Sequence, residues 1–236
     1  MNRQARLACI LFALAAVPGG ALRSQQQVRV PAGNGDSLDA DQYGSGSRAV
    51  VLAHGGRYDR GSWRPQAEAM AKAGFRVLAF DFRASVEARA GRETACLYDA
   101  ACLAADVLSA VRYLRQSGAA EVSVVGASLG GGAAAQASAD AGPGEIDRIV
   151  LLAPMPIGAP ERMRGRKLFI VARADTGSGD RPRLPAIRRQ YEQAPPPKSL
   201  HVLDGTAHAQ AIFATGEGER LMRAILDFLN EQGGGP

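Results

Sequence analysis

The stretch that decides the fold runs from residue 121 to residue 132 and reads E-V-S-V-V-G-A-S-L-G-G-G. Its apolar first half is typical of a strand buried on both faces, and its small second half is typical of a closely packed helix. Ser128 lies at the junction, in the pattern Gly-x-Ser-x-Gly. A serine on so tight a turn needs small neighbours, because its backbone is strained and other segments pass close by. The stretch predicts an exposed serine nucleophile; the alternative is a glycine-rich turn with a packing serine.

Outward from this stretch, apolar runs alternate with amphipathic segments. We expect buried strands at 48–53, 76–82, 121–125, 146–153, 167–172 and 199–203, with weak signals for short antiparallel strands at 28–30 and near Tyr43. Helices are expected at 62–73 with Ser62 as its cap, at 103–118, from 128, at 184–191 and at 221–229, and 84–101 is expected to be irregular. This alternation predicts one α/β domain with a mostly parallel twisted sheet and helices on both faces.

Composition agrees with a folded enzyme-sized domain. The chain has 236 residues, of which 46% are hydrophobic and 22% charged, and this excludes disordered and collagen-like proteins. A chain of this length buries enough surface to fold without a metal or a disulfide. The net charge of +5 is spread along the sequence rather than clustered. We therefore expect no nucleic-acid partner.

The N-terminus resembles a secretory signal. Arg3 and Arg6 precede an apolar run over 7–17, and Pro18-Gly19-Gly20-Ala21 supplies small residues for cleavage. The run is too short to cross a bilayer as a helix. We expect residues 1–21 to be removed, leaving 22–236 as a single domain in the periplasm or medium without a stable membrane span. The alternatives are an uncleaved anchor and a first core helix.

Removal of this segment leaves two of the three cysteines, Cys96 and Cys102. An even number in an oxidising compartment predicts a disulfide across this short loop. Two free thiols are the alternative, because a bridge needs a geometry that sequence does not supply. No cluster of histidines accompanies the pair, so we expect no metal site.

A serine hydroxyl near neutral pH needs a base, and the chain has three histidines. His208 follows the last expected strand in Gly205-Thr206-Ala207-His208, where it can reach over the sheet edge, so it is the predicted base. His54 directly follows the strand at 48–53 but precedes the serine, and His201 falls inside an expected strand, where a half-buried structural role is common. A solvent-exposed loop position is the alternative for His208.

The imidazole in turn needs an orienting carboxylate. Asp175 is the first acid after the strand at 167–172 and is the predicted partner, with Asp180 as its rival five residues later. The order Ser128, Asp175, His208 is the one expected when the nucleophile turn lies in the middle of a parallel sheet. A solvated or helix-capping aspartate is the alternative reading of Asp175.

With these motifs over residues 48–230, the sequence resembles the α/β-hydrolase superfamily, in a compact form similar to dienelactone-hydrolase-like esterases. The resemblance implies that His54-Gly55-Gly56 begins the oxyanion loop and that His54 is architectural. A backbone N–H of Gly56 or Arg57 would join that of Leu129 in stabilising an oxyanion. The sequence departs from the family after Arg83, where Ala84-Ser85-Val86-Glu87 and a cysteine-containing loop replace a glycine-rich turn.

The span 154–166 is short and rich in proline, so we expect no large cap domain and an open pocket walled in part by the 96–102 loop. The resemblance implies a serine hydrolase that cleaves small carboxylic esters through an acyl-enzyme, without a cofactor or metal. Thioesters, lactones and amides suit the same machinery. The contrasting hypotheses are a non-catalytic exported binding protein and an enzyme acting on an anionic envelope polymer. The oligomeric state is not predicted.

Overall fold

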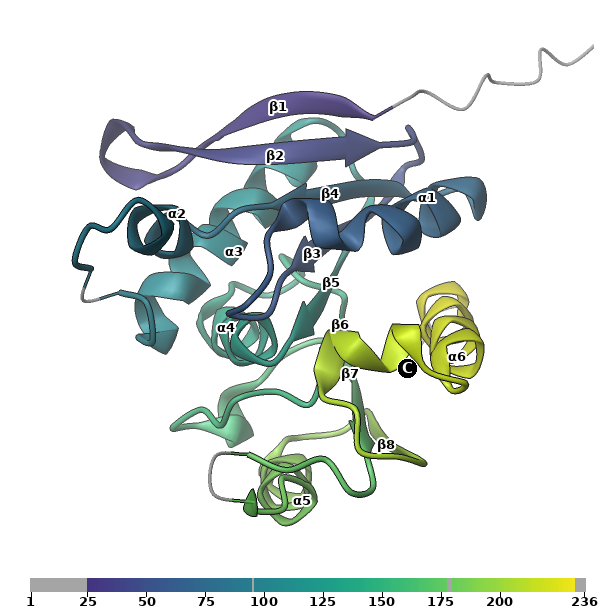
Figure 1. Ribbon diagram of the computed structural model, residues 1–236. Coiled ribbons are helices and arrows are strands. Elements are labelled where there is room, and N and C mark those ends of the chain that lie inside the picture. Colours follow the sequence, from purple (N-terminus) through teal and green to yellow (C-terminus); the bar gives the residue numbers. More distant parts are fainter. Residues whose placement is uncertain (1–24, 95, 178–179, 232–236) are drawn as a thin grey trace, which may run out of the picture.

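A computed structural model describes residues 25–94, 96–177 and 180–231 (Figure 1). The expected signal segment, residues 1–21, lies outside these ranges. The described residues form an eight-stranded sheet in the order β1-β2-β4-β3-β5-β6-β7-β8. Strands β3 to β8 run parallel to one another, whereas β1 and β2 are antiparallel additions at one edge. The carboxyl ends of the parallel strands therefore share one edge of the sheet.

The strands agree with the apolar runs of the sequence. They are β1 (Gln26–Pro31), β2 (Ser37–Tyr43), β3 (Arg48–Ala53), β4 (Arg76–Phe80), β5 (Glu121–Ala127), β6 (Arg148–Leu152), β7 (Arg166–Ala172) and β8 (Lys198–Leu203). The two weakly signalled antiparallel strands are present and longer than expected. Central strands such as β5 and β6 are buried almost throughout, which explains why their sequences are continuously apolar rather than alternating.

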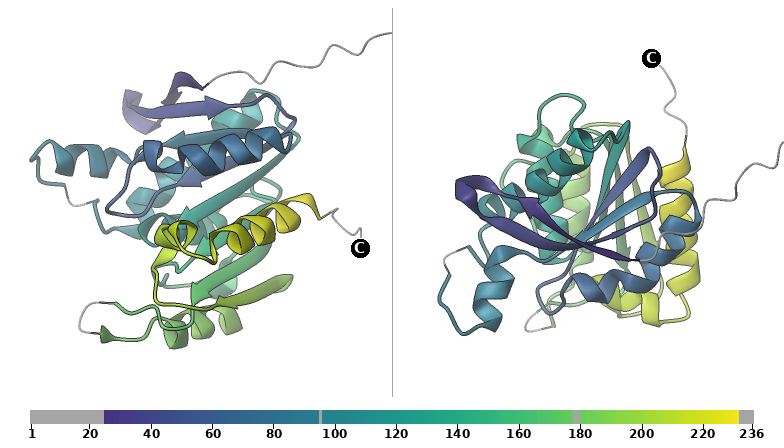
Figure 2. Two further views of the ribbon diagram at one scale, coloured as in Figure 1. Left: turned by 45° about the vertical axis from the view of Figure 1, so that its right-hand side comes forward. Right: turned by 90° about the horizontal axis from the view of Figure 1, so that it is seen from above.

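Helices cover both faces of the sheet (Figure 2). They are α1 (Arg64–Lys72), α2 (Arg83–Arg89), α3 (Ala100–Gln116), α4 (Leu129–Asp140), α5 (Leu184–Gln193) and α6 (Gly218–Asn230), with short 3-10 turns η1 (Gly33–Gly35), η2 (Arg60–Trp63), η3 (Pro160–Arg162) and η5 (Ala209–Ala214). Helices α1 and α6 lie on one face, and α3, α4 and α5 lie on the other. A mostly parallel sheet wound on both sides confirms the predicted fold class.

Two local expectations were wrong. Residues 83–89 form α2 rather than irregular chain, because Ala84 and Ser85 pack inward and the Arg83 backbone N–H and guanidinium both donate to Asp106 of α3. Ser62 does not cap α1. Its own N–H is instead capped by the side chain of Asp59 at the start of η2, which runs directly into the helix.

The crossing from β6 to β7 is short. Every residue from 153 to 165 is described, and this segment contains only the single turn η3. No cap domain is inserted here, as the sequence predicts. The carboxyl ends of the parallel strands are therefore not covered by one. Within the described ranges, no helix combines the length and apolarity needed to cross a membrane.

Candidate active site

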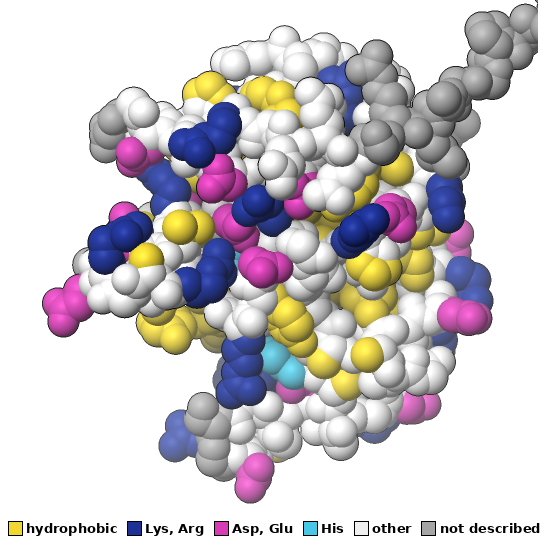
Figure 3. All heavy atoms as spheres, turned by 45° about the horizontal axis from the view of Figure 1, so that its top comes forward, with side chains coloured by type: hydrophobic (Ala, Val, Ile, Leu, Met, Phe, Trp, Pro, Cys, Tyr) yellow, Lys and Arg dark blue, Asp and Glu magenta, His cyan; other side chains and the backbone are white. Residues whose placement is uncertain are grey.

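A pocket of about 650 Å³ opens at the carboxyl ends of the parallel strands. In Figure 3 a histidine side chain lies in a hollow of the surface, with Lys or Arg side chains beside it. The residues that line the pocket come from loops after β3, β5, β6, β7 and β8 and from the loop before α3: Gly55, Gly56, Arg57, Tyr58, Tyr98, Ser128, Leu129, Met155, Thr176, Gly177, Arg183, His208, Ala209, Gln210 and Ala211. This is the place where open parallel sheets bind ligands.

Ser128 occupies the sharp turn between β5 and α4. Its φ of 52° lies in the left-handed region, which a residue with a side chain enters at a cost. Three backbone hydrogen bonds hold it there: its N–H donates to Leu152 O at 2.8 Å, and its carbonyl accepts from Gly132 and Met155 at 3.0 Å each. Hydrogen bonds to α4, to the end of β6 and to the segment after β6 therefore offset the cost of this strained backbone.

The two outer glycines of the pattern are required by close backbone contacts. A Cβ on Gly126 would lie 2.3 Å from Gly130 O, and a Cβ on Gly130 would lie 2.3 Å from Ala53 O at the end of β3. Both separations are shorter than Cβ atoms tolerate. Small residues at these positions allow α4 to start directly against the sheet and to present Ser128 above it.

The structure brings the predicted base and acid to the serine. His208 Nε2 lies 2.8 Å from Ser128 Oγ, and His208 Nδ1 lies 2.7 Å from Asp175 Oδ2. With Nδ1 protonated, the ring donates to the carboxylate and accepts the hydroxyl proton of Ser128. His208 stays one-third exposed, whereas Asp175 is fully buried. One side of the imidazole thus contacts a buried carboxyl group, and the other faces the Ser128 hydroxyl.

Asp175, rather than its rival, is the acid that contacts the ring. Asp180 is exposed. Asp175 is further held by Arg183, whose backbone N–H donates to Asp175 O at 3.0 Å and whose Nε lies 3.5 Å from Asp175 Oδ1. Sequence reasoning missed Arg183, because its role depends on the bridge between Thr176 and Pro182 that folds the loop back.

The other two histidines lie outside this contact chain. His54 is buried, its Nδ1 is 2.9 Å from Gly55 O, and Phe82 N–H donates to its Nε2 at 3.4 Å. Burial lowers the pKa of His54, so the ring is neutral and structural. His201 lies in β8 as expected but is exposed rather than half-buried, because β8 is the edge strand.

The expected oxyanion loop turns sharply over the serine. Tyr58 N–H donates to Gly55 O at 2.9 Å, which closes a four-residue turn with Gly56 and Arg57 at its centre. A Cβ on Gly56 would be 3.9 Å from the Leu129 side chain, so the two residues are neighbours. The N–H of Leu129 belongs to the first turn of α4, where amides have no intrahelical acceptor. Gly56, Arg57 and Leu129 line the same pocket as Ser128, so their backbone N–H groups are candidate oxyanion donors.

Gln210 is a residue of this site that sequence reasoning did not find. It follows His208 by two positions and is almost completely buried. Its Oε1 accepts from Gly55 N–H at 2.8 Å, and its Nε2 donates to Ser62 Oγ at 3.0 Å. The side chain thereby ties the loop that carries His208 to the loop after β3. A glutamine in a loop gives no sequence signal of such a role.

The cysteine pair lies beside the pocket. Cys96 and Cys102 have their Cα atoms 5.4 Å apart, a separation that suits a disulfide, and Tyr98 between them lines the pocket. The part of the chain that the structure describes contains no group of three or more His, Cys, Asp or Glu side chains that could hold a metal ion.

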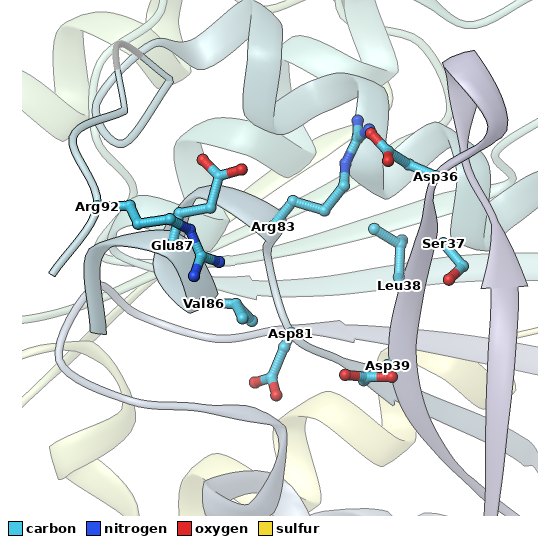
Figure 4. A pocket seen from close by; sticks show the side chains of 9 residues that line it. All are labelled: Asp36, Ser37, Leu38, Asp39, Asp81, Arg83, Val86, Glu87 and Arg92. Atoms are coloured by element: carbon cyan, nitrogen blue, oxygen red, sulfur yellow. The ribbon is translucent and has the colours of Figure 1, made fainter. Parts of the chain in front are cut away.

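A smaller pocket of about 160 Å³ lies at the antiparallel edge, between β2 and α2 (Figure 4). In Figure 4 the Arg83 side chain extends toward Asp36, and the distance between them is 2.9 Å. Arg83 also pairs with Asp106 at 2.7 Å. Arg83 is therefore held between two carboxylates, and neither a serine–histidine pair nor a cysteine lines this pocket in the described chain. It is a weaker candidate for chemistry than the pocket at Ser128.

Comparison with known proteins places these features in a family. Residues 48–183 match the family described as the alpha/beta hydrolase fold. No curated protein matches the sequence. Among solved structures, a dienelactone hydrolase from Anabaena variabilis is similar with a TM-score of 0.70 and 23% identity, covering 87% of this chain and 94% of its own.

Two further solved structures have the same fold. An esterase from Pyrococcus furiosus is similar with a TM-score of 0.70 and 20% identity, over 87% of this chain and 92% of the esterase. A dienelactone hydrolase-like promiscuous phosphotriesterase from metagenomic libraries is similar with a TM-score of 0.70 and 15% identity, over 89% of this chain and 98% of the other. At these identities the similarity establishes the architecture, and the predicted dienelactone-hydrolase-like resemblance is confirmed at that level.

Proposed function

The chain belongs to the alpha/beta hydrolase fold family, and we propose that it is a serine hydrolase that cleaves carboxylic esters through an acyl-enzyme. The observation that carries this proposal is the continuous contact from Asp175 through His208 to Ser128, with distances of 2.7 and 2.8 Å. A nucleophile, a base and an orienting carboxylate in this order make up the minimum set for acyl transfer. The arrangement opens onto a pocket that a small substrate can enter.

In the first half of the proposed reaction, His208 Nε2 takes the hydroxyl proton as Ser128 Oγ attacks the ester carbonyl carbon. Asp175 stabilises the imidazolium that forms. The carbonyl oxygen becomes an oxyanion and receives hydrogen bonds from Leu129 N–H and from the N–H of Gly56 or Arg57. Loss of one such donor costs about 2.7–4 kcal/mol of transition-state stabilisation in comparable enzymes. His208 then passes its proton to the leaving alkoxide, and the acyl group stays on Ser128.

In the second half, water takes the place of the alcohol. His208 removes a proton from this water as its oxygen attacks the acyl carbon, and the same N–H groups hold the new oxyanion. Return of the proton to Ser128 Oγ releases the acid and restores the enzyme. Each step needs only groups that lie within or beside the pocket, so the proposal requires no cofactor or metal.

Lactones are the second candidate class of substrate. A lactone is an internal ester, and one of the structurally similar proteins carries the name dienelactone hydrolase. The open pocket and the short crossing between β6 and β7 leave room for a ring to approach Ser128. Thioesters and amides suit the same steps. A non-catalytic binding protein is disfavoured, because nothing in ligand binding alone requires a strained serine aligned with a histidine and a buried aspartate.

We further propose that the enzyme acts outside the cytoplasm. Residues 1–21 carry the signal features of the sequence, and the Cys96–Cys102 pair has a separation that suits a disulfide in an oxidising compartment. Sequencing of the mature N-terminus tests this proposal: a start at residue 22 supports it. An N-terminus that retains residues 1–21 contradicts it.

The largest effect is expected for Ser128→Ala. This change removes the nucleophile, and we expect ester hydrolysis to fall by about 10⁴-fold to 10⁶-fold with the fold intact. A fluorophosphonate probe should label the wild-type protein and fail to label Ser128→Ala. Ser109→Ala is the matched control, since Ser109 lies on an exposed turn of α3 and donates only to Ala105 O. Equal labelling of wild type and Ser128→Ala would contradict the proposal.

A further inference from the structure

Two exposed tyrosine side chains line the same pocket. Among the described residues, the large hydrophobic side chains that remain exposed are Tyr58 and Tyr98, at 39% and 75%. Both line the pocket that contains Ser128 and His208. Single exposed hydrophobic residues need no explanation, but two that line the same pocket indicate a binding surface.

Tyr98 is held over the pocket by a rigid support. Asp99 N–H donates to Cys96 O at 3.1 Å, which closes a tight turn with Tyr98 near its tip. The Asp99 side chain caps α3 by accepting from Ala101 and Cys102 N–H. Cys96 and Cys102 close the same segment. An exposed ring on a loop anchored this closely loses little freedom when a ligand binds, which favours recognition.

Tyr58 approaches from the oxyanion side of the pocket. It is the last residue of the Gly55–Tyr58 turn, and its Cδ2 atom lies 3.3 Å from the position that a Cβ on Gly55 would occupy. The Tyr58 ring therefore packs against Gly55, and both residues line the same pocket as Ser128. Its backbone carbonyl accepts from Arg89, which fixes the end of the turn.

The remaining large side chains of the pocket suit an aromatic group as well. Arg57 and Arg183 carry planar guanidinium groups, which stack on aromatic faces and are attracted to their electrons. Met155 supplies a thioether, which makes favourable contacts with rings. No aspartate or glutamate lines the pocket in the described chain. A saturated chain would gain hydrophobic contact here but none of these ring-specific contacts.

We propose that the substrates are esters that carry an aromatic ring, and that Tyr58 and Tyr98 form the subsite that binds this ring. This inference rests on the proposed ester hydrolysis for its role in catalysis. The subsite itself is a statement about binding, so it can be tested with and without turnover.

The turnover test uses two pairs of esters that differ only in the ring. Ethyl phenylacetate is compared with ethyl cyclohexylacetate, and benzyl acetate with cyclohexylmethyl acetate; a methylene separates ring and ester in each. The saturated ring is the more hydrophobic, so preference for the aromatic member cannot come from burial alone. We expect kcat/KM to favour the aromatic member about 2- to 12-fold in at least one pair, as aromatic contacts of 0.5–1.5 kcal/mol imply.

Substitutions of the two tyrosines test whether their rings cause the preference for the aromatic ester. Tyr58→Leu and Tyr98→Leu keep apolar bulk but lose the ring, and each should move the ratio of the responding pair toward 1, whereas Tyr98→Phe should retain it. His201→Ala is the control, since His201 is an exposed ring on β8 outside the pocket, and it should leave the ratio unchanged. A ratio of 1 or below in both pairs, or one that the leucine variants do not change, would overturn the proposal.

A binding test separates this inference from the proposed reaction. In Ser128→Ala, saturation-transfer NMR should show magnetisation passing from the protein to the ring protons of ethyl phenylacetate or benzyl acetate. The signal should fall when Tyr58→Leu and Tyr98→Leu are added to Ser128→Ala. Ring binding without turnover in the wild type would refute ester hydrolysis but support the subsite. No ring transfer to either ester would refute the subsite whatever the activity.

Discussion

Two polar clusters lie at the carboxyl edge of the same sheet and differ in what their groups contact. Around Ser128, the hydroxyl and the imidazole of His208 face a pocket of about 650 Å³. Around Asp81, which follows β4, the carboxylate accepts from Arg60 N–H at 2.9 Å, pairs with the Arg60 guanidinium, and lies 3.5 Å from Arg89 Nη2. Position at a strand end is therefore not sufficient for chemistry. A reactive atom must also remain available to a substrate.

The charges around Asp81 serve the fold. Asp41 and Asp81 are almost fully buried, and Arg60 lies between them, with its Nε 3.4 Å from Asp41 Oδ2. Burial of two carboxylates without a cation would be costly, so this arginine compensates them. Asp175 at the active site is buried as deeply, but its main partner is His208, a group that can give up and take back a proton. The Asp81 cluster holds fixed charges, whereas the proposed mechanism transfers a proton at the Ser128 cluster.

The comparison is tested most directly by replacing the carboxylate with an amide at each of the two candidate acid positions. Asp175→Asn should lower kcat by about 10⁴-fold, because an amide no longer holds the tautomer and charge of His208. Asp180→Asn should have a minor effect, since Asp180 is exposed. Steady-state kinetics and a thermal melt of both variants check this. A large loss in Asp180→Asn with a small one in Asp175→Asn would assign the acid to Asp180.

In the Asp81 cluster, Arg60→Met should affect stability rather than chemistry. It leaves the buried Asp41 carboxylate without its cation and Asp81 with only Arg89 at 3.5 Å, and we expect the free energy of unfolding to fall by about 3 kcal/mol. Urea denaturation measures the loss, and fluorophosphonate labelling of the folded variant reports on Ser128. Labelling at the wild-type rate is expected. Unchanged stability would show that the cluster does not hold the fold.

Gln210 lines the Ser128 pocket and bonds to Gly55 and Ser62 in the segment after β3, and its replacement sharpens the comparison. Gln210→Met removes the bonds to Gly55 and Ser62 and should lower kcat by about 10- to 100-fold, since small displacements of catalytic groups have such effects. KM should change less than kcat. Gln190→Met is the matched control, because Gln190 is equally buried and accepts from Ile157 N–H outside the pocket. Equal losses of kcat in the two variants would refute a positioning role.

The smallest expected effect concerns pH. Burial lowers the pKa of His54 below 6.5, so the unfolded chain binds a proton there that the folded protein does not. The contribution of His54 to stability is complete above pH 6.5 and is lost as pH falls below that value, by at most about 1.4 kcal/mol per pH unit. His54→Gln should reduce this slope in urea titrations at pH 7 to 5. His201→Gln, at an exposed site, should keep it.

The sequence was a good guide wherever burial imposes a pattern. Strands β3 to β7 were predictable, because a parallel strand covered on both faces must be continuously apolar. The turn at Ser128 was predictable for a related reason. Gly126 and Gly130 lie so close to neighbouring backbone that a side chain at either position would clash with it. Helix α2 was missed, because it is too short to show a helical periodicity. Its formation depends instead on the contacts of Arg83 with Asp106.

Order along the chain determined which residues could meet, because parallel strands bring their carboxyl ends to one edge whatever loops connect them. Ser128, Asp175 and His208 are therefore candidates from sequence alone. Only the tertiary structure placed Asp175 rather than Asp180 against His208, placed Gln210 between two loops and brought Tyr58 and Tyr98 to the same pocket. The physical reason is that these choices depend on loop conformation, which is fixed by hydrogen bonds and packing between residues far apart in sequence.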